Sequence, residues 1–181
     1  MKRLSPGLML AGLGMSIAVA VLMLFAAGVT YIYPLSALCL FVAALMIWVP
    51  IREEHGLIFA VAEYVIVSGV SLLISRSSVF TYLYVLIFGH YGIVRFLLRR
   101  KLRDRLMTVL IRLLIFNLLA AIGLAVARYG LGYDIMTFLP DIPLYIIIPI
   151  LEAGFLVFMA LYKLFSYLFD TTLRSALLPR R

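Results

Sequence analysis

The sequence predicts an all-α fold, a bundle of six transmembrane helices that forms one integral membrane domain over residues 1–181. Of the 181 residues, 66% are hydrophobic and 13% are charged, and the mean hydropathy is +1.17. A soluble domain of this length cannot cover so much apolar surface. The apolar residues form continuous runs without period-two alternation, which indicates helices rather than a β-barrel.

Six apolar runs are long enough to cross a bilayer, which takes about 20 helical residues to span roughly 30 Å of hydrocarbon. These runs cover residues 8–27, 34–49, 57–75, 79–98, 106–127 and 142–169. Lys2 and Arg3 precede the first run as in a signal peptide, but the run is long and five others follow, so we expect an uncleaved helix. Cys39 is the only cysteine, so it forms no internal disulfide.

The basic residues predict the orientation of the chain. They gather at the termini and in every second break, as Lys2, Arg3, Arg52, the cluster Arg95–Arg105, Arg174, Arg180 and Arg181. The other breaks contain only Arg76 and Arg128. The positive-inside rule therefore places both termini in the cytoplasm, and we expect a bacterial cytoplasmic (inner) membrane.

The net charge of +8 follows from this distribution and requires no nucleic-acid partner. The cluster Arg95–Arg105 lies in a short cytoplasmic break and lacks interleaved aromatic residues. We therefore expect it to contact anionic lipid rather than nucleic acid.

The outer breaks contain more kinds of polar residue than membrane topology alone requires. The segments Gly28–Tyr33 and Arg128–Asp141 combine glycine with tyrosine, and the second adds proline and aspartate. Glycine and proline allow sharp turns, and the tyrosine and aspartate tips form hydrogen bonds. A ligand site that opens outward is one interpretation. The ordinary belt of interfacial tyrosines is the other.

Polar residues inside the spans are candidates for function, because a charge at mid-bilayer costs about 2.5–3.5 kcal/mol on insertion scales. Glu63 and Arg112 lie at similar depth in the inner half, which predicts an ion pair or, alternatively, a catalytic role. His90 and Glu152 form a structural hydrogen bond or line the floor of an outward cavity. The predicted ligand-binding residues are Tyr31, Tyr33, Arg76, Tyr82, His90, Asn117, Arg128, Tyr133 and Glu152.

The first run carries small residues at helical spacing. Gly12, Ser16 and Ala20 recur every four residues, and Gly14 and Ala18 form a second pair. Small residues allow another helix to approach closely. The stripe either packs inside the bundle or docks a separate membrane subunit.

Motifs of known enzymes are absent from the sequence. It contains no HExxH, no cysteine pair, no glycine-rich phosphate loop and no GxSxG. His55 and His90 differ in depth and do not suggest a metal site. We therefore expect no catalytic residues, no metal and no cofactor. A proton-coupled secondary transporter is an alternative, because glutamate and histidine inside the spans can carry protons, but six spans without an evident internal repeat form a small unit for independent alternating access.

The six-span layout, with both termini inside and the stripe Gly12, Ser16 and Ala20, resembles the substrate-binding S-components of energy-coupling factor (ECF) transporters. The resemblance implies a vitamin or other micronutrient bound in an outward pocket made by later helices and outer loops. It also implies a transmembrane coupling subunit that docks on the first helix, and two cytoplasmic ATPases.

The sequence has a weaker resemblance to the MreD-like membrane proteins of cell shape, which scaffold other membrane proteins. The predicted function is therefore the substrate-capture subunit of an ECF-type importer. The alternative is a non-catalytic scaffold or assembly subunit of a cell-envelope complex, and a polytopic membrane enzyme comes third.

Overall fold

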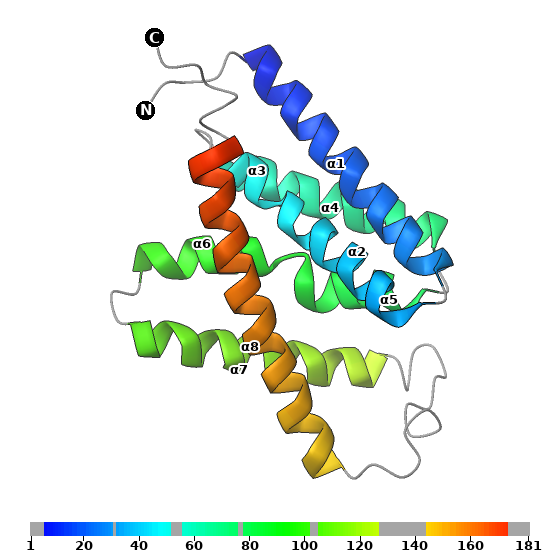
Figure 1. Cartoon of the computed structure of the whole chain (residues 1–181), viewed down its shortest axis with the longest axis vertical. Coiled ribbons are helices and arrows are strands. Elements are labelled where there is room, and N and C mark those ends of the chain that lie inside the picture. The colour runs from blue at the N-terminus through cyan, green and yellow to red at the C-terminus, as the bar shows by residue number, and fades with distance from the viewer. Residues whose placement is uncertain are drawn as a thin grey trace. The chain divides into compact units, whose positions relative to one another are not determined.

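A computed structural model describes residues 6–30, 32–51, 56–75, 78–101, 105–126 and 144–173, and the secondary structure of these residues is helical (Figure 1). The α-helices are α1 (Pro6–Val29), α2 (Tyr33–Met46), α3 (Trp48–Ile51), α4 (Gly56–Ile74), α5 (Val79–Leu83), α6 (Tyr91–Lys101), α7 (Arg105–Ala125) and α8 (Leu144–Leu168). Two π-helical turns cover Tyr84–Phe88 and Phe169–Leu173. The chain divides into two compact units, Met1–Gly132 and Tyr133–Arg181.

Six helical stretches of the described chain are long and apolar enough to cross a membrane. They are Leu10–Val29, Tyr33–Ile51, Gly56–Ile74, Val79–Leu98, Leu106–Gly123 and Ile148–Thr172. Each overlaps one predicted run, so the predicted all-α fold with six spans is confirmed. The boundaries differ by a few residues, and the orientation of the spans remains a prediction.

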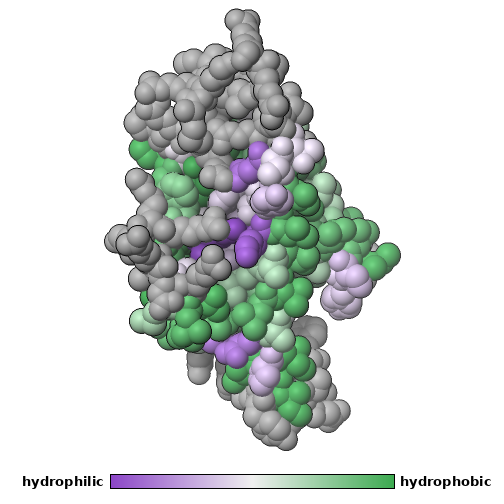
Figure 2. All heavy atoms as spheres, turned by 60° about the vertical axis from the view of Figure 1, so that its left-hand side comes forward, coloured by the Kyte–Doolittle hydropathy of each residue, from purple (hydrophilic) through white to green (hydrophobic). Residues whose placement is uncertain are grey.

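The surface of the described helices agrees with a lipid environment. On α7, Leu110, Leu114 and Leu118 are each more than half exposed. Figure 2 shows hydrophobic residues over much of the coloured part of one face, with hydrophilic residues gathered mainly near its centre. Apolar exposure on this scale is unfavourable in water and favourable in hydrocarbon. The chain is therefore a multi-pass membrane protein.

Helix α1 is central to the packing of the first unit, since it lies along both α2 and α4 (Figure 1). Its buried side chains form one stripe: Ser16, Ala20, Leu24 and Ala27. Small residues face this stripe, and Ala43 of α2 and Ala60 of α4 are fully buried. Side chains of this size let the helix backbones approach closely, which is how helices gain packing energy in a membrane.

The second span is interrupted between α2 and α3. Met46 is the last residue of α2, and Ile47 separates it from α3, which contains Pro50. A proline in a helix lacks an N–H donor, and its ring clashes with the carbonyl four residues earlier, here that of Met46. Pro50 therefore explains the position of the interruption.

Glycines permit two close contacts near the ends of spans. A Cβ atom added at Gly56, where α4 begins, would collide with the backbone of Pro50 and Ile51. A Cβ added at Gly28 of α1 would lie 3.2 Å from the Oγ of Ser78, which directly precedes α5. A larger residue at position 56 would have to displace backbone, whereas one at position 28 would require only a small shift of a serine side chain.

The turn from α1 to α2 is closed by side chains. The Thr30 hydroxyl donates to the Ala26 carbonyl at 2.7 Å, and the Ser36 hydroxyl donates to the Thr30 carbonyl at 3.0 Å. Pro34 lies in the first turn of α2, where its missing N–H costs no helical hydrogen bond. These features define where the first span ends and the second begins.

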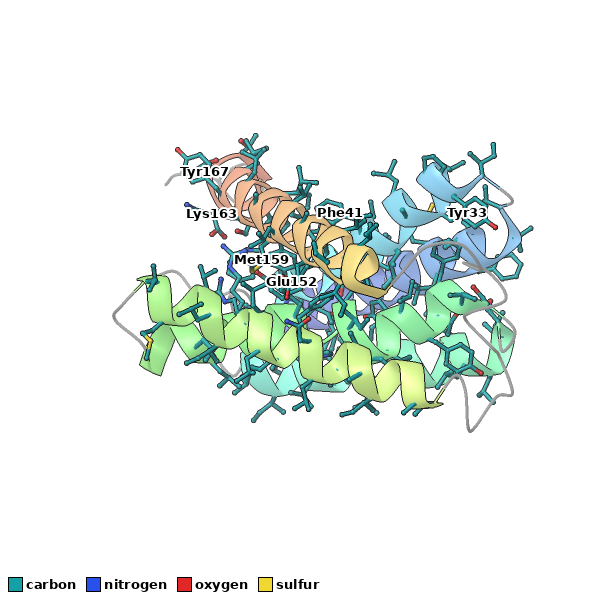
Figure 3. All side chains as sticks on the ribbon, turned by 90° about the horizontal axis from the view of Figure 1, so that it is seen from below. Tyr33, Phe41, Glu152, Met159, Lys163 and Tyr167 are labelled. Carbon is teal, nitrogen blue, oxygen red and sulfur yellow. The ribbon has the colours of Figure 1, made fainter. Side chains whose placement is uncertain are left out.

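The described residues of the second unit form α8 and the π-helical turn that follows it. One stripe of α8 is buried, comprising Phe155, Phe158, Met159, Tyr162 and Ser166. The rings of Phe158 and Tyr162 lie 5.9 Å apart, and those of Phe155 and Phe158 lie 6.2 Å apart. Figure 3 labels Glu152, Lys163 and Tyr167 on the same helix, of which Lys163 and Tyr167 are exposed.

Candidate functional site

The fourth span is broken near its middle. Helix α5 ends at Leu83, the π-helical turn covers Tyr84–Phe88, and α6 begins only at Tyr91. Within the break, the Gly89 N–H donates to the Tyr84 carbonyl at 2.7 Å, five residues back. π-Helical turns inside α-helices are rare and frequently occur at functional sites. We call the segment Tyr84–His90 the fourth-span break.

Glycine is required at the fourth-span break. A Cβ added to Gly89 would lie 2.8 Å from the Tyr84 carbonyl oxygen and 2.9 Å from the Tyr84 ring. Tyr84 itself is fully buried, so its ring has little room to move away. The break thus combines a widened helical turn with an aromatic ring held against the backbone.

Tyr64 of α4 connects the third span to the fourth-span break. Its hydroxyl donates to the Val85 carbonyl at 2.6 Å. Its ring centroid lies 6.3 Å from that of Tyr84 and 6.2 Å from that of His90, and the planes of the Tyr64 ring and the imidazole make an angle of 77°. Tyrosine faces interact with rings and cations, and an imidazole donates or accepts hydrogen bonds. The contacts of Tyr64 thus place two tyrosine rings and one imidazole together at the fourth-span break.

The sequence-based predictions selected His90 but missed Tyr64 and Tyr84. Tyr64 lies in the middle of an apolar run, away from the interfaces, so an aromatic belt does not account for it. The position of Tyr64 within the span was the feature of the sequence that could have identified it as a candidate. Lys163, inside the sixth span, was also missed, and its long stem lets an exposed ammonium reach toward an interface.

The other predicted ligand-binding residues have different environments. Tyr82 on α5 and Glu152 on α8 are half-buried, whereas Asn117 on α7 is exposed. Tyr33, labelled in Figure 3, is 81% exposed at the start of α2. The structure brings His90 together with Tyr64, and it shows no site formed by the predicted set as a whole among the described residues. The remaining members lie outside the described residues: Tyr31, Arg76, Arg128 and Tyr133.

Glu63 is fully buried on α4, beside the Ser16 hydroxyl of α1. Among the described residues, neither carboxyl oxygen of Glu63 has a hydrogen-bond partner, and the Nε of Arg112 has none either. The predicted Glu63–Arg112 ion pair is therefore wrong for this structure. Similar depth did not bring the side chains together, because α7 packs against α6 and the fourth-span break rather than along the Glu63 face of α4.

The predicted docking stripe lies mainly inside the first unit. Ser16 is 3% exposed and Ala20 is fully buried, while Gly12 is half-buried. This is the internal packing that the sequence left open as the alternative, so Ser16 and Ala20 do not form a free docking face. The second small pair, Gly14 and Ala18, is exposed instead.

The environment of Arg95 differs from the predicted contact of the cluster Arg95–Arg105 with anionic lipid. It is 2% exposed, and its guanidinium carbon lies 5.1 Å from the centroid of the Trp48 ring. A cation over an indole face is stabilised by the ring quadrupole. Arg95 therefore joins α6 to α3 and does not face lipid headgroups. The other basic side chains up to Arg105 are not among those that the structure describes.

Comparison with known proteins identifies no family for this chain. No protein-family model, no curated protein and no solved structure matches the chain. The evidence for a finer function therefore comes from the geometry of its own residues. That geometry belongs to an all-α, multi-pass membrane protein with a broken fourth span.

Proposed function

We propose that the chain is the solute-binding subunit of an importer of the ECF type in a bacterial cytoplasmic membrane. Its solute lies at the fourth-span break, against Tyr64 and His90. The observation that carries the proposal is the π-helical turn Tyr84–Phe88 in the middle of a span. Transporters build substrate sites where membrane helices are discontinuous. A purely structural scaffold needs no such break, because a continuous helix satisfies its own backbone.

The side chains at the break indicate the kind of solute. The Tyr64 ring offers an aromatic face, and His90 offers one hydrogen-bonding group nearby. These groups suit a small organic molecule that has a ring or another flat apolar part and at least one polar atom. They are consistent with a micronutrient and do not select a particular one.

The partners of this subunit follow from what its sequence lacks. The chain has no nucleotide-binding motif, so ATPases and a membrane coupling subunit must supply the energy. Since Ser16 and Ala20 are buried, the coupling subunit has to bind another surface. The exposed side of α1, which includes Gly14 and Ala18, remains accessible for it.

Native mass spectrometry of the protein purified in detergent tests the proposal. We expect a small molecule to co-purify with the wild-type protein and to be lost from the His90→Ala variant. Tyr167→Ala is the matched control, because Tyr167 is 65% exposed on α8 and is not among the predicted ligand-binding residues, and it should retain the molecule.

Two results would count against a solute-binding subunit. The first is a wild-type protein that carries no small molecule but co-purifies with cell-envelope proteins, which would favour the MreD-like scaffold. The second is equal retention of the molecule by His90→Ala and the wild type, which would remove the site from the fourth-span break. Co-expression with a coupling subunit and ATPases then tests whether an importer assembles.

A further inference from the structure

Glu63 occupies an unusual position for a carboxyl group. It is fully buried in the third span, on the same face of α4 as Ala60 and Val67, which are also fully buried. An ionised carboxylate is strongly unfavourable in such surroundings unless a cation and hydrogen bonds compensate it. The elements packed around α4 therefore decide which form of Glu63 this structure can hold.

Among the described side chains, none forms a hydrogen bond or ion pair with the Glu63 carboxyl. Helix α4 packs against α1, α3, α5 and α6, and the sequences of the first three contain no charged residue. On α6, the buried Arg95 lies over Trp48. The neighbouring Tyr64 directs its hydroxyl to the Val85 carbonyl, and His90 faces the Tyr64 ring.

The Ser16 hydroxyl is the polar group that lies beside the Glu63 carboxyl. Ser16 already donates its proton to the Leu13 carbonyl at 2.9 Å. Its oxygen can therefore still accept a hydrogen bond but has no second proton to donate. An ionised carboxylate only accepts hydrogen bonds, whereas a protonated carboxyl can donate one. With the Ser16 proton directed to the Leu13 carbonyl, an ionised Glu63 has no donor at this position, and neither of its oxygens has a hydrogen bond among the described residues.

The described polar groups at this position are few. Metal ions such as Ca²⁺ take six to eight oxygen ligands, and Glu63 and Ser16 provide too few. The other residues of these faces, Ala20, Ala60 and Val67, are fully buried and offer no polar side chain to an organic ligand. A proton needs a single oxygen atom.

We infer that Glu63 is a proton-binding site: its carboxyl carries a proton while α1 and α4 are packed together, and releases it when α1 moves away. Loss of the proton would leave the Glu63 carboxylate charged and without a partner. Deprotonation therefore disfavours the state in which α1 and α4 are packed together. The occupancy of this site is therefore linked to the contact between the first and third spans. This inference goes beyond the proposed function and does not depend on a solute at the fourth-span break.

Infrared spectroscopy of protein labelled with carboxyl-¹³C glutamate tests the inference directly. At neutral pH we expect the carbonyl band of a protonated glutamic acid, and we expect Glu63→Gln to lose it completely. Glu152→Gln is the matched control, since Glu152 is the other glutamate within a span and is half-buried on α8, and it should keep the band. A wild-type spectrum without the band, or a band that survives in Glu63→Gln, would overturn the inference.

The test remains decisive if Glu63→Gln does not fold. The other glutamates are Glu53, Glu54 and Glu152, so a variant with glutamine at these three positions leaves Glu63 alone to give the signal. The band should persist there, and its absence would refute the proton site. His90→Ala should keep the band and Glu63→Gln should keep the co-purified molecule, so the two proposals fail separately.

Discussion

The hydroxyl of Tyr64 donates a 2.6 Å hydrogen bond to the carbonyl oxygen of Val85, between the third span and the fourth-span break. In a regular helix that carbonyl would be bonded within its own segment, and lipid offers no substitute partner. The tyrosine therefore both stabilises the interrupted backbone and holds its own ring beside His90.

Tyr64→Phe should destabilise the protein. The change removes the donor and leaves a carbonyl in a poorly solvated region without its partner, which costs about 1–3 kcal/mol. Unfolding of the purified protein, followed by heating or by denaturing detergent, measures the loss. Tyr33→Phe removes the same hydroxyl from a side chain that is 81% exposed and should change little. Equal stability of the two variants would mean that the Tyr64 bond contributes nothing.

Gly89→Ala should disturb the fourth-span break. The new methyl group would lie 2.8 Å from the Tyr84 carbonyl oxygen and 2.9 Å from its buried ring. Overpacking of this kind costs about 1–3 kcal/mol. Gly69 of α4 is the control, because a Cβ there meets nothing within 4 Å, and Gly69→Ala should be neutral or slightly stabilising. A fully stable Gly89→Ala protein would contradict the contact with Tyr84.

Ser16→Leu should destabilise the packing of α1 on its neighbours. Ser16 is 3% exposed, so a leucine at this position overpacks a helix interface at a cost of about 1–3 kcal/mol. Gly14→Leu, on the exposed side of the same helix, should be tolerated because its Cβ points into open space. The same thermal unfolding assay compares both variants. The reverse order of stability would show that the other side of α1 faces the bundle.

Glu63 and Arg112 should behave as independent residues. Among the described residues, the Glu63 oxygens and the Arg112 Nε have no hydrogen-bond partner. The effects of replacing the two residues on the free energy of unfolding should therefore add within about 0.3–0.5 kcal/mol. A double-mutant cycle with Glu63→Gln and Arg112→Gln measures the coupling. A double variant much more stable than the sum of the single effects predicts would restore the ion pair.

The orientation of the spans is tested by chemical labelling in intact cells. Single cysteines at positions 77, 103 and 133 are introduced into a Cys39→Ala background, which removes the native thiol. Positions 77 and 133 should react with an impermeant maleimide and position 103 should not, because of the positive-inside rule. The opposite pattern would reverse the topology.

The sequence predicted the spans well because length and hydropathy alone determine whether a helix can cross a membrane. Depth along a span was also accessible by counting residues. The helix faces were not, because uniformly apolar helices give no signal for their direction. Glu63 and Arg112 were therefore paired by depth, although the two side chains do not meet.

The fourth-span break was equally hidden from the sequence. Residues 84–88 are YVLIF, an apolar stretch without proline, and Gly89 was the single sign of irregularity. The break depends on tertiary contacts, namely the Tyr64 hydroxyl at Val85 and the packing of α2 and α7 against the π-helical turn. No pattern within the fourth span encodes these contacts.

The contact at Gly56 has a mechanical consequence. Because α4 begins directly against the backbone of Pro50 and Ile51, any side chain larger than hydrogen at position 56 would have to push the second and third spans apart. Tyr64 of the same helix donates to the Val85 carbonyl. The third span is therefore tied at its start to the second span and further along to the fourth-span break.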